Sequence, residues 1–379
     1  MFAECPQAPD TPFLLIDKSK YLRNIARLYS RVEALGSRVR PHLKTLRSPD
    51  AARYLLRDTC SPATVSTLAE AEAFAAAGYS NLLYAVGIAP HKLPRVARLM
   101  QQGVEMHILL DSEQQALAVA AYGQQNGVVF SVFIEVDCDG HRGGIPPHSE
   151  ALPELARIIE DGGSRLTGLL AHAGESYQCR TDDEIRAAAK TECVAIRTAG
   201  YRLREWGFDC PILSVGATPT AHFAEDLTDI TEVRAGVFTT FDLVMKNIGV
   251  CRVEDIAISV VATVIGHNRD KGWVFIDAGW MALSRDRGTA NQSQDYGYGM
   301  VCSPNGDPLE GLIVNTTNQE HGIIELAQQA SFTVNDFPVG SRVRIFPNHA
   351  CATAAMHQHY YVVDESSSVP EIWPRIMGW

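Results

Sequence analysis

The sequence predicts an α/β protein in which a TIM-type (β/α)8 barrel is followed by an antiparallel β domain. Two observations lead to this prediction. Between residues 12 and 240, short apolar or β-branched runs alternate with amphipathic helical patterns, which is typical of a parallel sheet, and about eight such units fill a barrel. After residue 250 the long helical patterns stop, and strands follow one another between turns. An open, doubly wound sheet is the structural alternative to the barrel.

The predicted barrel covers residues 12–250. Its predicted strands are the apolar runs at residues 12–17, 37–43, 63–68, 81–86, 106–111, 130–137, 166–172 and 210–215. Amphipathic patterns supply helices between them, most clearly at residues 48–58, 68–78 and 183–207. The helical patterns match the crossovers that a parallel sheet requires.

The predicted β domain covers residues 251–379, to which residues 1–11 can be added. Its strands are expected at residues 256–267, 272–279, 309–315, 340–349 and 357–364. The segment at 284–300 is polar, contains glycine and has no clear period, so we expect a long loop there. Loops of that length in compact domains are often functional.

Composition narrows the class of partner. The chain has 379 residues, and its 44 acidic residues outnumber its 33 basic ones without long runs of either sign. We therefore expect a small-molecule ligand, with no nucleic acid and no membrane as partner. The first residues do not resemble a signal peptide, and no segment approaches the ~20 apolar residues of a membrane span, so a cytoplasmic location is expected. The nine cysteines are scattered singly, which favours reduced thiols.

Lys44 is the first candidate for chemistry. The motif RPHLKT at residues 40–45 ends an early predicted strand and directly precedes a helical pattern. Lys44 is therefore predicted at the carboxyl end of a barrel strand, where barrel active sites form. Burial among apolar or cationic neighbours would lower the pKa of a lysine there and let it bond covalently to a carbonyl compound. The alternative interpretation is a surface lysine beside a turn.

Two segments in the late barrel are candidate phosphate anchors. SVGATPT at residues 214–220 and RAGV at residues 234–237 both follow predicted strands. Small residues let backbone N–H groups approach an anion, and threonine hydroxyls add further donors. Loops after the seventh and eighth strands often bind phosphate in this fold. Either segment is also compatible with an ordinary turn.

His349 and Cys351 are candidate metal ligands. They stand two residues apart at the end of a predicted strand, and in extended chain such residues project to the same face. An imidazole and a thiolate suit a divalent metal, with zinc the natural match. A buried cysteine beside a hydrogen-bonded histidine is the alternative. His357 and His359 share the spacing and form a competing pair.

Taken together, the motifs resemble one enzyme family. The sequence is similar to the D-threonine aldolase and D-serine dehydratase family, fold-type III enzymes that depend on pyridoxal 5′-phosphate (PLP) and have a barrel like the N-terminal domain of alanine racemase. The similarity spans essentially the whole chain. The motifs that carry it occur in the family's order: RPHLKT, HAGESY, SVGATPTA, RAGVF, FDLVMKNIGVC, DAGW, SRDRGTA, NQEHG and PNHAC.

The resemblance implies roles for individual residues. Lys44 holds PLP covalently and later acts as the base at the substrate α-carbon, and Arg142 faces the cofactor ring. His349 and Cys351 hold a divalent metal, which is zinc, manganese, cobalt, nickel or magnesium. The residues that cradle the phosphate are Gly216, Thr218, Gly236 and Val237. The residues that line the pocket beside the cofactor are His172 and Tyr177.

The resemblance is incomplete at the phosphate site. The family commonly has a second glycine and a tyrosine where this chain has Ala217 and Phe238. A phenylalanine donates no hydrogen bond, so the phosphate must depend more on backbone N–H groups and on Thr218. Tyr177 also has an alternative interpretation, as an aromatic residue that only packs.

The resemblance implies a lyase that eliminates water from D-3-hydroxy amino acids. The expected reactions convert D-threo-3-hydroxyaspartate to oxaloacetate and ammonia, or D-serine to pyruvate and ammonia. The alternative reaction is the aldolase cleavage to glycine and an aldehyde. Aldolase members have His-x-Asp at the metal site and dehydratases have His-x-Cys, so Cys351 favours dehydration.

The sequence is also compatible with two other functions, a racemase and a PLP carrier protein. Racemase-like chemistry needs no metal beside the substrate, and a PLP carrier protein would leave the region after residue 250 without a role. Arg285 and Arg287 are candidates for binding the second carboxylate of 3-hydroxyaspartate, with two solvated loop arginines as the alternative. The resemblance also implies a homodimer, in which the metal ligands act in cis or in trans.

Overall fold

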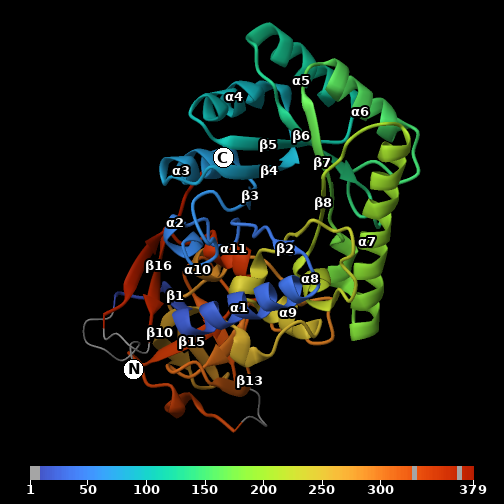
Figure 1. Ribbon diagram of the computed structural model, residues 1–379. Helices are drawn as coiled ribbons and strands as arrows, with labels where there is room; N and C mark the ends of the chain where they lie inside the picture. The colour runs from blue at the N-terminus through green and yellow to red at the C-terminus, as the bar shows by residue number, and fades with distance from the viewer. Residues whose placement is uncertain (1–8, 327–330, 365–368) are drawn as a thin grey trace. The chain divides into compact units, whose positions relative to one another are not determined.

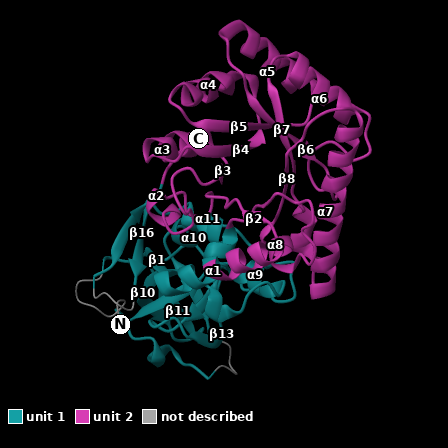
Figure 2. Ribbon diagram, viewed as in Figure 1, with its two compact units in different colours: residues 1–25, 237–375 teal, residues 26–236, 376–379 magenta. Residues whose placement is uncertain are grey.

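The strands of the computed structural model, which describes residues 9–326, 331–364 and 369–379, form two separate sheets. The chain divides into two units, one of residues 26–236 and 376–379 and one of residues 1–25 and 237–375 (Figure 2). The first division falls within helix α1 (Lys18–Ala34). Residues 1–8, and with them Cys5, lie outside the described residues.

The unit of residues 26–236 contains an eight-stranded parallel sheet in the order β2-β9-β8-β7-β6-β5-β4-β3. A parallel bridge between His42 and Thr64 joins the two ends of this order and closes the sheet. The predicted (β/α)8 barrel is therefore confirmed. Its strands are β2 (Arg38–Val39), β3 (Ala63–Val65), β4 (Asn81–Gly87), β5 (Glu105–Leu110), β6 (Ser131–Val136), β7 (Arg165–Ala171), β8 (Ile212–Val215) and β9 (Glu232–Val233).

Helices follow the barrel strands along the chain, and Figure 1 shows α4 to α7 on the outer side of the strands. Two of the helices, α3 and α7, begin with capping boxes, in which a threonine and a glutamate three residues later satisfy each other's backbone N–H groups. The helices are α2 (Pro49–Ala52), α3 (Leu68–Ala76), α4 (Leu93–Gln101), α5 (Glu113–Asn126), α6 (Ala151–Asp161), α7 (Asp182–Glu205) and α8 (Thr218–Phe223).

One predicted barrel strand belongs to the other sheet. Strand β1 (Phe13–Asp17) pairs with β10 (Ile258–Asn268) and β16 (His359–Val363), so the assignment of residues 12–17 to the barrel was wrong. The strand in its place is β9, which is only two residues long. A short buried apolar run reads the same in either sheet, and two residues are too few to produce a pattern.

The second unit contains a nine-stranded sheet in the order β11-β14-β13-β12-β15-β10-β1-β16-β17, which is antiparallel except where β1 meets β16. The predicted antiparallel β domain is thus confirmed. Its remaining strands are β11 (Trp273–Ile276), β12 (Met300–Cys302), β13 (Pro308–Thr317), β14 (Gly322–Glu325), β15 (Arg342–Phe346) and β17 (Glu371–Pro374). Its short helices are α9 (Leu243–Asn247), α10 (Trp280–Leu283) and α11 (Ala350–Ala354).

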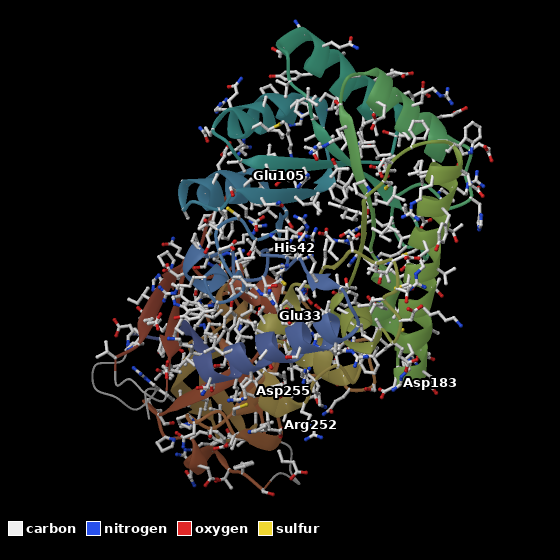
Figure 3. The ribbon with its side chains drawn as sticks, viewed as in Figure 1. Glu33, His42, Glu105, Asp183, Arg252 and Asp255 are labelled. Atoms are coloured by element: carbon white, nitrogen blue, oxygen red, sulfur yellow. The ribbon has the colours of Figure 1, made fainter. Side chains whose placement is uncertain are left out.

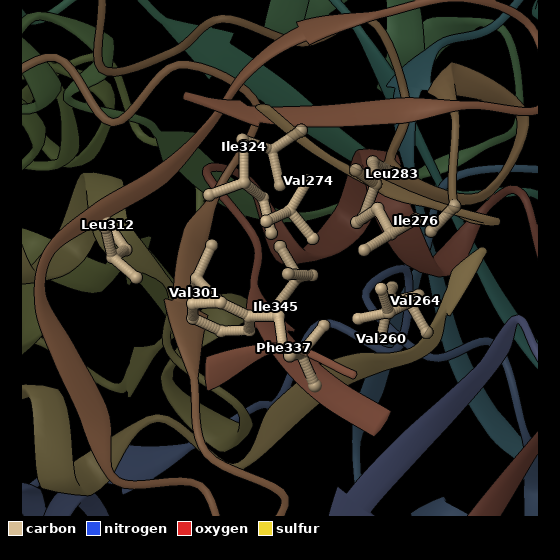
Figure 4. Close-up of a cluster of buried hydrophobic side chains, with 14 of the residues drawn as sticks. Val260, Val264, Val274, Ile276, Leu283, Val301, Leu312, Ile324, Phe337 and Ile345 are labelled. Carbon is tan, nitrogen blue, oxygen red and sulfur yellow. The ribbon is translucent and has the colours of Figure 1, made fainter. Parts of the chain in front are cut away.

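The core of this second unit is a cluster of aliphatic side chains from alternate positions of neighbouring strands (Figure 4). Val260, Val264, Val274, Ile276 and Ile345 are all fully buried in it. Each such side chain stabilises the fold by about 1.5–3 kcal/mol relative to exposure. The cluster therefore gives a firm support for the turn that follows β15, where the candidate metal ligands lie.

Candidate active site

Lys44 lies in the turn after β2, two residues beyond the bridge that closes the barrel. Its backbone surroundings are fixed on both sides, because His42 N–H donates to the Ala235 carbonyl (2.7 Å) and Leu43 N–H donates to the Thr64 carbonyl (2.8 Å). The Lys44 side chain is exposed. An amine is thus presented at the carboxyl end of the parallel strands, where barrel enzymes place their chemistry.

His172 follows β7 at the same end of the barrel. Its Nδ1 donates to the Gly216 carbonyl oxygen at 2.8 Å, which assigns the proton to Nδ1 and leaves Nε2 as an acceptor. Burial is the largest cause that lowers the pKa of His172, and the hydrogen bond to Gly216 opposes it. With the positive charges of Arg234, Arg142 and Lys44, the net result is a pKa of about 3. The ring is therefore neutral near neutral pH.

Arg142 and Tyr177 also lie beside His172. Arg142 belongs to the loop after β6, its side chain is 60% exposed, and it donates to Glu135 at 3.3 Å. The Tyr177 ring, on the 3₁₀ helix η3 (Gly174–Gln178), has its centroid 6.5 Å from that of His172. The structure thus gathers Lys44, Arg142, His172 and Tyr177, four of the residues predicted from the sequence, at one end of the barrel.

Gly216 and Thr218 form the turn between β8 and α8. Gly216 has φ +138°, and a Cβ there would fall 2.0 Å from the Arg234 carbonyl oxygen, so only glycine fits. Thr218 is buried, and its Oγ1 has no hydrogen-bond partner among the described residues. A buried hydroxyl left unpaired costs about 1–3 kcal/mol, which a ligand oxygen would recover. A phosphate fits this unfilled donor.

The second predicted phosphate segment divides between the two units. A Cβ on Gly236 would lie 3.3 Å from the His42 carbonyl oxygen and 3.4 Å from Thr45 Oγ1, so Gly236 lines the turn that carries Lys44. Val237 begins the 3₁₀ helix η4 (Val237–Thr239) in the other unit, where it is buried. Phe238 beside it is fully buried.

Two buried charged residues near this site make contacts that the sequence did not predict, although Arg234 belongs to the predicted phosphate segment 234–237. Arg234 donates to Ser214 Oγ (2.8 Å) and to the Ala171 carbonyl (2.6 Å), and thereby links β8 and β7. Glu192 lies on the buried face of α7, seven residues after Ile185 on the same face. A glutamate among the apolar residues of an amphipathic helix is unusual, and this pattern in the sequence could have indicated a functional role for Glu192.

The candidate metal ligands lie in the other unit, after β15. The prediction that His349 and Cys351 project from one face of an extended strand was wrong. The chain turns at His349, which precedes α11, and Cys351 lies within that helix. The two side chains nevertheless meet and hydrogen-bond. His349 Nδ1 also bonds to Asp286 Oδ2 at 2.8 Å, which leaves Nε2 for a metal.

Electrostatics at His349 agree with this pairing. Burial alone lowers the pKa of His349, but the hydrogen bonds to Asp286 and Cys351 outweigh burial and raise the pKa well above its ordinary value. The His349 interaction holds the pKa of Asp286 below its usual range. A metal binds neutral imidazole and thiolate, so it would take the place of the shared proton.

The turn that carries His349 and Cys351 is held from two sides. Asp242 caps α9 by accepting from Met245 N–H and also accepts from Ala350 N–H, both at 2.9 Å. Asn348 donates to the Gly297 carbonyl at 2.6 Å, which ties the turn to the segment predicted as a long loop. These contacts orient the ligand side chains before any ion binds.

The donor set at this turn fits a divalent metal. A histidine backed by a carboxylate, together with a cysteine, matches the ligand chemistry of zinc sites. Within the described ranges, no group of three or more histidine, cysteine, aspartate or glutamate side chains is placed to hold a metal. His349 and Cys351 supply two ligands, and a metal held by them would take water or substrate as its other ligands.

The competing histidines and the loop arginines have partners of their own. His357 Nε2 donates to the Ala282 carbonyl (3.0 Å), while His359 Nε2 contacts the Tyr361 hydroxyl (3.3 Å). Arg287 forms an ion pair with Asp295 at 2.7 Å. The guanidinium of Arg285 lies over the ring of Trp280, 4.9 Å from its centroid.

Comparison with known families classifies both parts of the chain. Residues 16–243 match the family described as "Alanine racemase, N-terminal domain", and residues 257–363 match the one described as "Putative serine dehydratase domain". The protein is therefore an enzyme of the class that joins an alanine racemase-like barrel to a serine dehydratase-type β domain.

In the part of the chain that the structure describes, no helix is long and apolar enough to cross a membrane.

Individual relatives narrow the assignment. D-threo-3-hydroxyaspartate dehydratase from Delftia sp. (strain HT23) is 48% identical, over 98% of each chain. A cysteine-to-alanine variant of D-threo-3-hydroxyaspartate dehydratase, described as a metal-free form, has a TM-score of 0.95 with 47% identity over 98% of each chain. An alanine racemase-like protein from Idiomarina loihiensis also has a TM-score of 0.95, with 58% identity over 98% of each chain. D-serine dehydratase from Dictyostelium discoideum is 28% identical over 95% of each chain. The chain belongs to the D-threonine aldolase and D-serine dehydratase family.

Proposed function

We propose that this protein is a lyase, dependent on PLP and a divalent metal, that eliminates water from D-3-hydroxy amino acids. The proposed reactions convert D-threo-3-hydroxyaspartate to oxaloacetate and ammonia, or D-serine to pyruvate and ammonia. The observation that carries the proposal is the contact of His349 with Cys351, backed by Asp286, in a chain closely similar to a dehydratase.

The barrel residues would prepare the α-carbon for reaction. PLP, when bound, supplies a ring into which electrons from the substrate α-carbon can delocalise. Lys44 Nζ anchors the cofactor and then takes the α-proton. Thr218 Oγ1 and the backbone around Gly216 and Gly236 bind the phosphate, and Val237 follows Gly236 in the chain. Because His172 is neutral, it adds no charge and offers Nε2 as an acceptor, while Arg142 and Tyr177 line the pocket.

The β domain would activate the leaving hydroxyl. A divalent metal on His349 and Cys351 supplies a Lewis acid for an oxygen that is otherwise a poor leaving group. Asp286 holds the His349 ring in orientation through Nδ1. A thiolate ligand favours zinc over magnesium, and we propose zinc. A relative of 47% identity with a cysteine-to-alanine change is described as a metal-free form, which supports a metal cofactor in this family.

Cys351 separates this proposal from aldolase cleavage. The family resemblance implies an aspartate at this position in aldolases and a cysteine in dehydratases, and this chain has Cys351. The serine dehydratase-type match over residues 257–363 gives the β domain a role that a PLP carrier would lack. We therefore favour loss of water over cleavage of the Cα–Cβ bond.

The proposal extends to assembly and location. The family resemblance supports a homodimer, and light scattering can test this assembly. It also supports a D-amino acid as the small-molecule partner. No disulfide joins the cysteines within the described residues, which agrees with a reducing compartment, and we propose the cytoplasm.

The test uses purified protein supplied with PLP and zinc. We expect ammonia release from D-threo-3-hydroxyaspartate or D-serine, loss of activity after complete chelation, and recovery when zinc is added back. Lys44→Ala should abolish both turnover and the absorbance of lysine-bound PLP, whereas the exposed Lys190→Ala serves as control. Activity that survives complete metal removal would exclude the role given to His349 and Cys351.

A further inference from the structure

Glu192 connects the two loops that carry the candidate PLP-binding residues. It is only 1% exposed, in the middle of α7, whose first turn is marked by Asp183 in Figure 3. Its Oε1 accepts from Ala173 N–H (3.0 Å) and from Gly216 N–H (2.8 Å). Its Oε2 accepts from the Thr220 hydroxyl (2.8 Å). One carboxylate thus joins the loop after β7 to the loop after β8.

Each of these three donors neighbours a residue of the candidate site. Ala173 directly follows His172, while Gly216 and Thr220 flank Thr218 on either side. The His172 Nδ1 hydrogen bond to the Gly216 carbonyl closes a ring of contacts with Glu192. The position of the His172 ring and the position of the unpaired Thr218 hydroxyl therefore depend on the same carboxylate.

The charge of Glu192 does not by itself favour a phosphate nearby. Burial raises the pKa of Glu192, and the N–H of Gly216, the Thr220 hydroxyl and Arg234 oppose that rise. A negative group beside a phosphate site repels the ligand, so its advantage must lie in the hydrogen bonds. A glutamine could make the same three contacts without the charge, because the Thr220 hydroxyl can accept as well as donate.

We propose that Glu192 is a positioning residue that clamps the β7 loop to the β8 loop and holds the phosphate-binding turn in register with His172. The inference rests on the proposed PLP site. The clamp acts on the part of the proposed site that binds the phosphate, and its loss should therefore affect ligands with a phosphate most. Loss of the clamp should reduce the preference for PLP over pyridoxal, which has the same ring without the phosphate.

The experiment measures dissociation constants of PLP and of pyridoxal for the cofactor-free protein, with circular dichroism to verify folding. Glu192→Met removes all three contacts at similar volume, and we expect it to reduce the preference for PLP about tenfold or more. Glu192→Gln should keep the preference. Thr220→Val removes the contact of Thr220 with Glu192, together with the hydrogen bond that Thr220 Oγ1 accepts from Ala217 N–H, and should lose part of the preference for PLP. Glu205→Met, the same change on an exposed face of α7, should behave like wild type.

The outcomes separate this role from the PLP site itself. A folded Glu192→Met variant that keeps the wild-type preference, or that weakens PLP and pyridoxal equally, would overturn the role of Glu192. If that variant does not fold, an unchanged preference in Thr220→Val overturns it, and a reduced one supports it. Wild-type protein that binds neither compound would overturn the proposed PLP site, and the clamp with it.

Discussion

At the residue scale, Thr218 is the clearest candidate for a side-chain contact with the phosphate. Its hydroxyl is buried without a partner in the described structure, next to the tight turn at Gly216. We predict that Thr218→Val weakens PLP binding about five- to tenfold, because one hydrogen bond to phosphate is lost. Thr218→Ser keeps the hydroxyl and is the matched control. Equal dissociation constants for wild type and Thr218→Val would remove Thr218 from the site.

Asp286 allows a second prediction at this scale. Because it fixes the His349 ring through Nδ1, Asp286→Ala should weaken zinc binding about 10- to 100-fold. Competition with a chromogenic chelator measures the affinity directly. Asp270→Ala, which removes an exposed carboxylate from the turn between β10 and β11 in the same unit, should leave the affinity unchanged. Equal losses in both variants would point to a general disturbance of the unit.

The sequence predicts candidate residues that stand in motifs and misses residues that support them from a distance. Lys44, His349 and Cys351 were predicted because their neighbours in the chain form recognisable motifs. Asp286 and Asp242 lie 63 residues before His349 and 108 before Ala350, and no local pattern connects residues so far apart. Such contacts follow from the fold, which sequence periodicity predicts only in outline.

At the element scale, strand β9 is held by charge more than by apolar contacts. Glu232, in β9, accepts from Arg40 Nε (2.7 Å) and from Ser214 Oγ (2.8 Å), and all three side chains are buried. The strand was missed because its two residues are a glutamate and a valine. A short strand held by a polar network has no hydrophobic period to detect.

This network makes β9 sensitive to loss of one charge. We predict that Glu232→Gln lowers the free energy of unfolding by about 3 kcal/mol, because Arg40 is left as a buried charge without its counter-ion. Glu33→Gln breaks an exposed pair with Arg57 and should change it by less than about 1 kcal/mol. Urea unfolding of both variants measures the difference, and similar losses in the two would contradict this account of β9.

At the scale of the whole molecule, periodicity was sufficient to predict a barrel and an antiparallel domain. The change from alternating helices and strands to successive strands appears directly in the sequence. Periodicity did not predict which sheet the strand at residues 12–17 joins, because a buried strand has the same composition in both sheets. The pairing of β1 with β10 and β16 depends on contacts more than 240 residues apart.

The stability of the whole molecule should fall in mild acid. Burial, helped by the positive charge of Arg40, lowers the pKa of His107 to about 3. The unfolded chain therefore binds a proton below the ordinary pKa of 6.5, and the folded state does not, so stability decreases as the pH falls. From pH 7 to pH 5 the loss from this group is about 2 kcal/mol. Urea unfolding of wild type and His107→Asn at both pH values should give a smaller pH dependence for the variant. Equal dependence would contradict the assignment.

The central claim is that this enzyme removes water from its substrate, with Lys44 and the His349–Cys351 pair as the decisive groups. The most direct measurement identifies the products formed from D-threo-3-hydroxyaspartate by the wild-type protein with PLP and zinc. We predict oxaloacetate and ammonia in equal amounts. Glycine and glyoxylate, formed without ammonia, would contradict the claim and assign the protein to the aldolases.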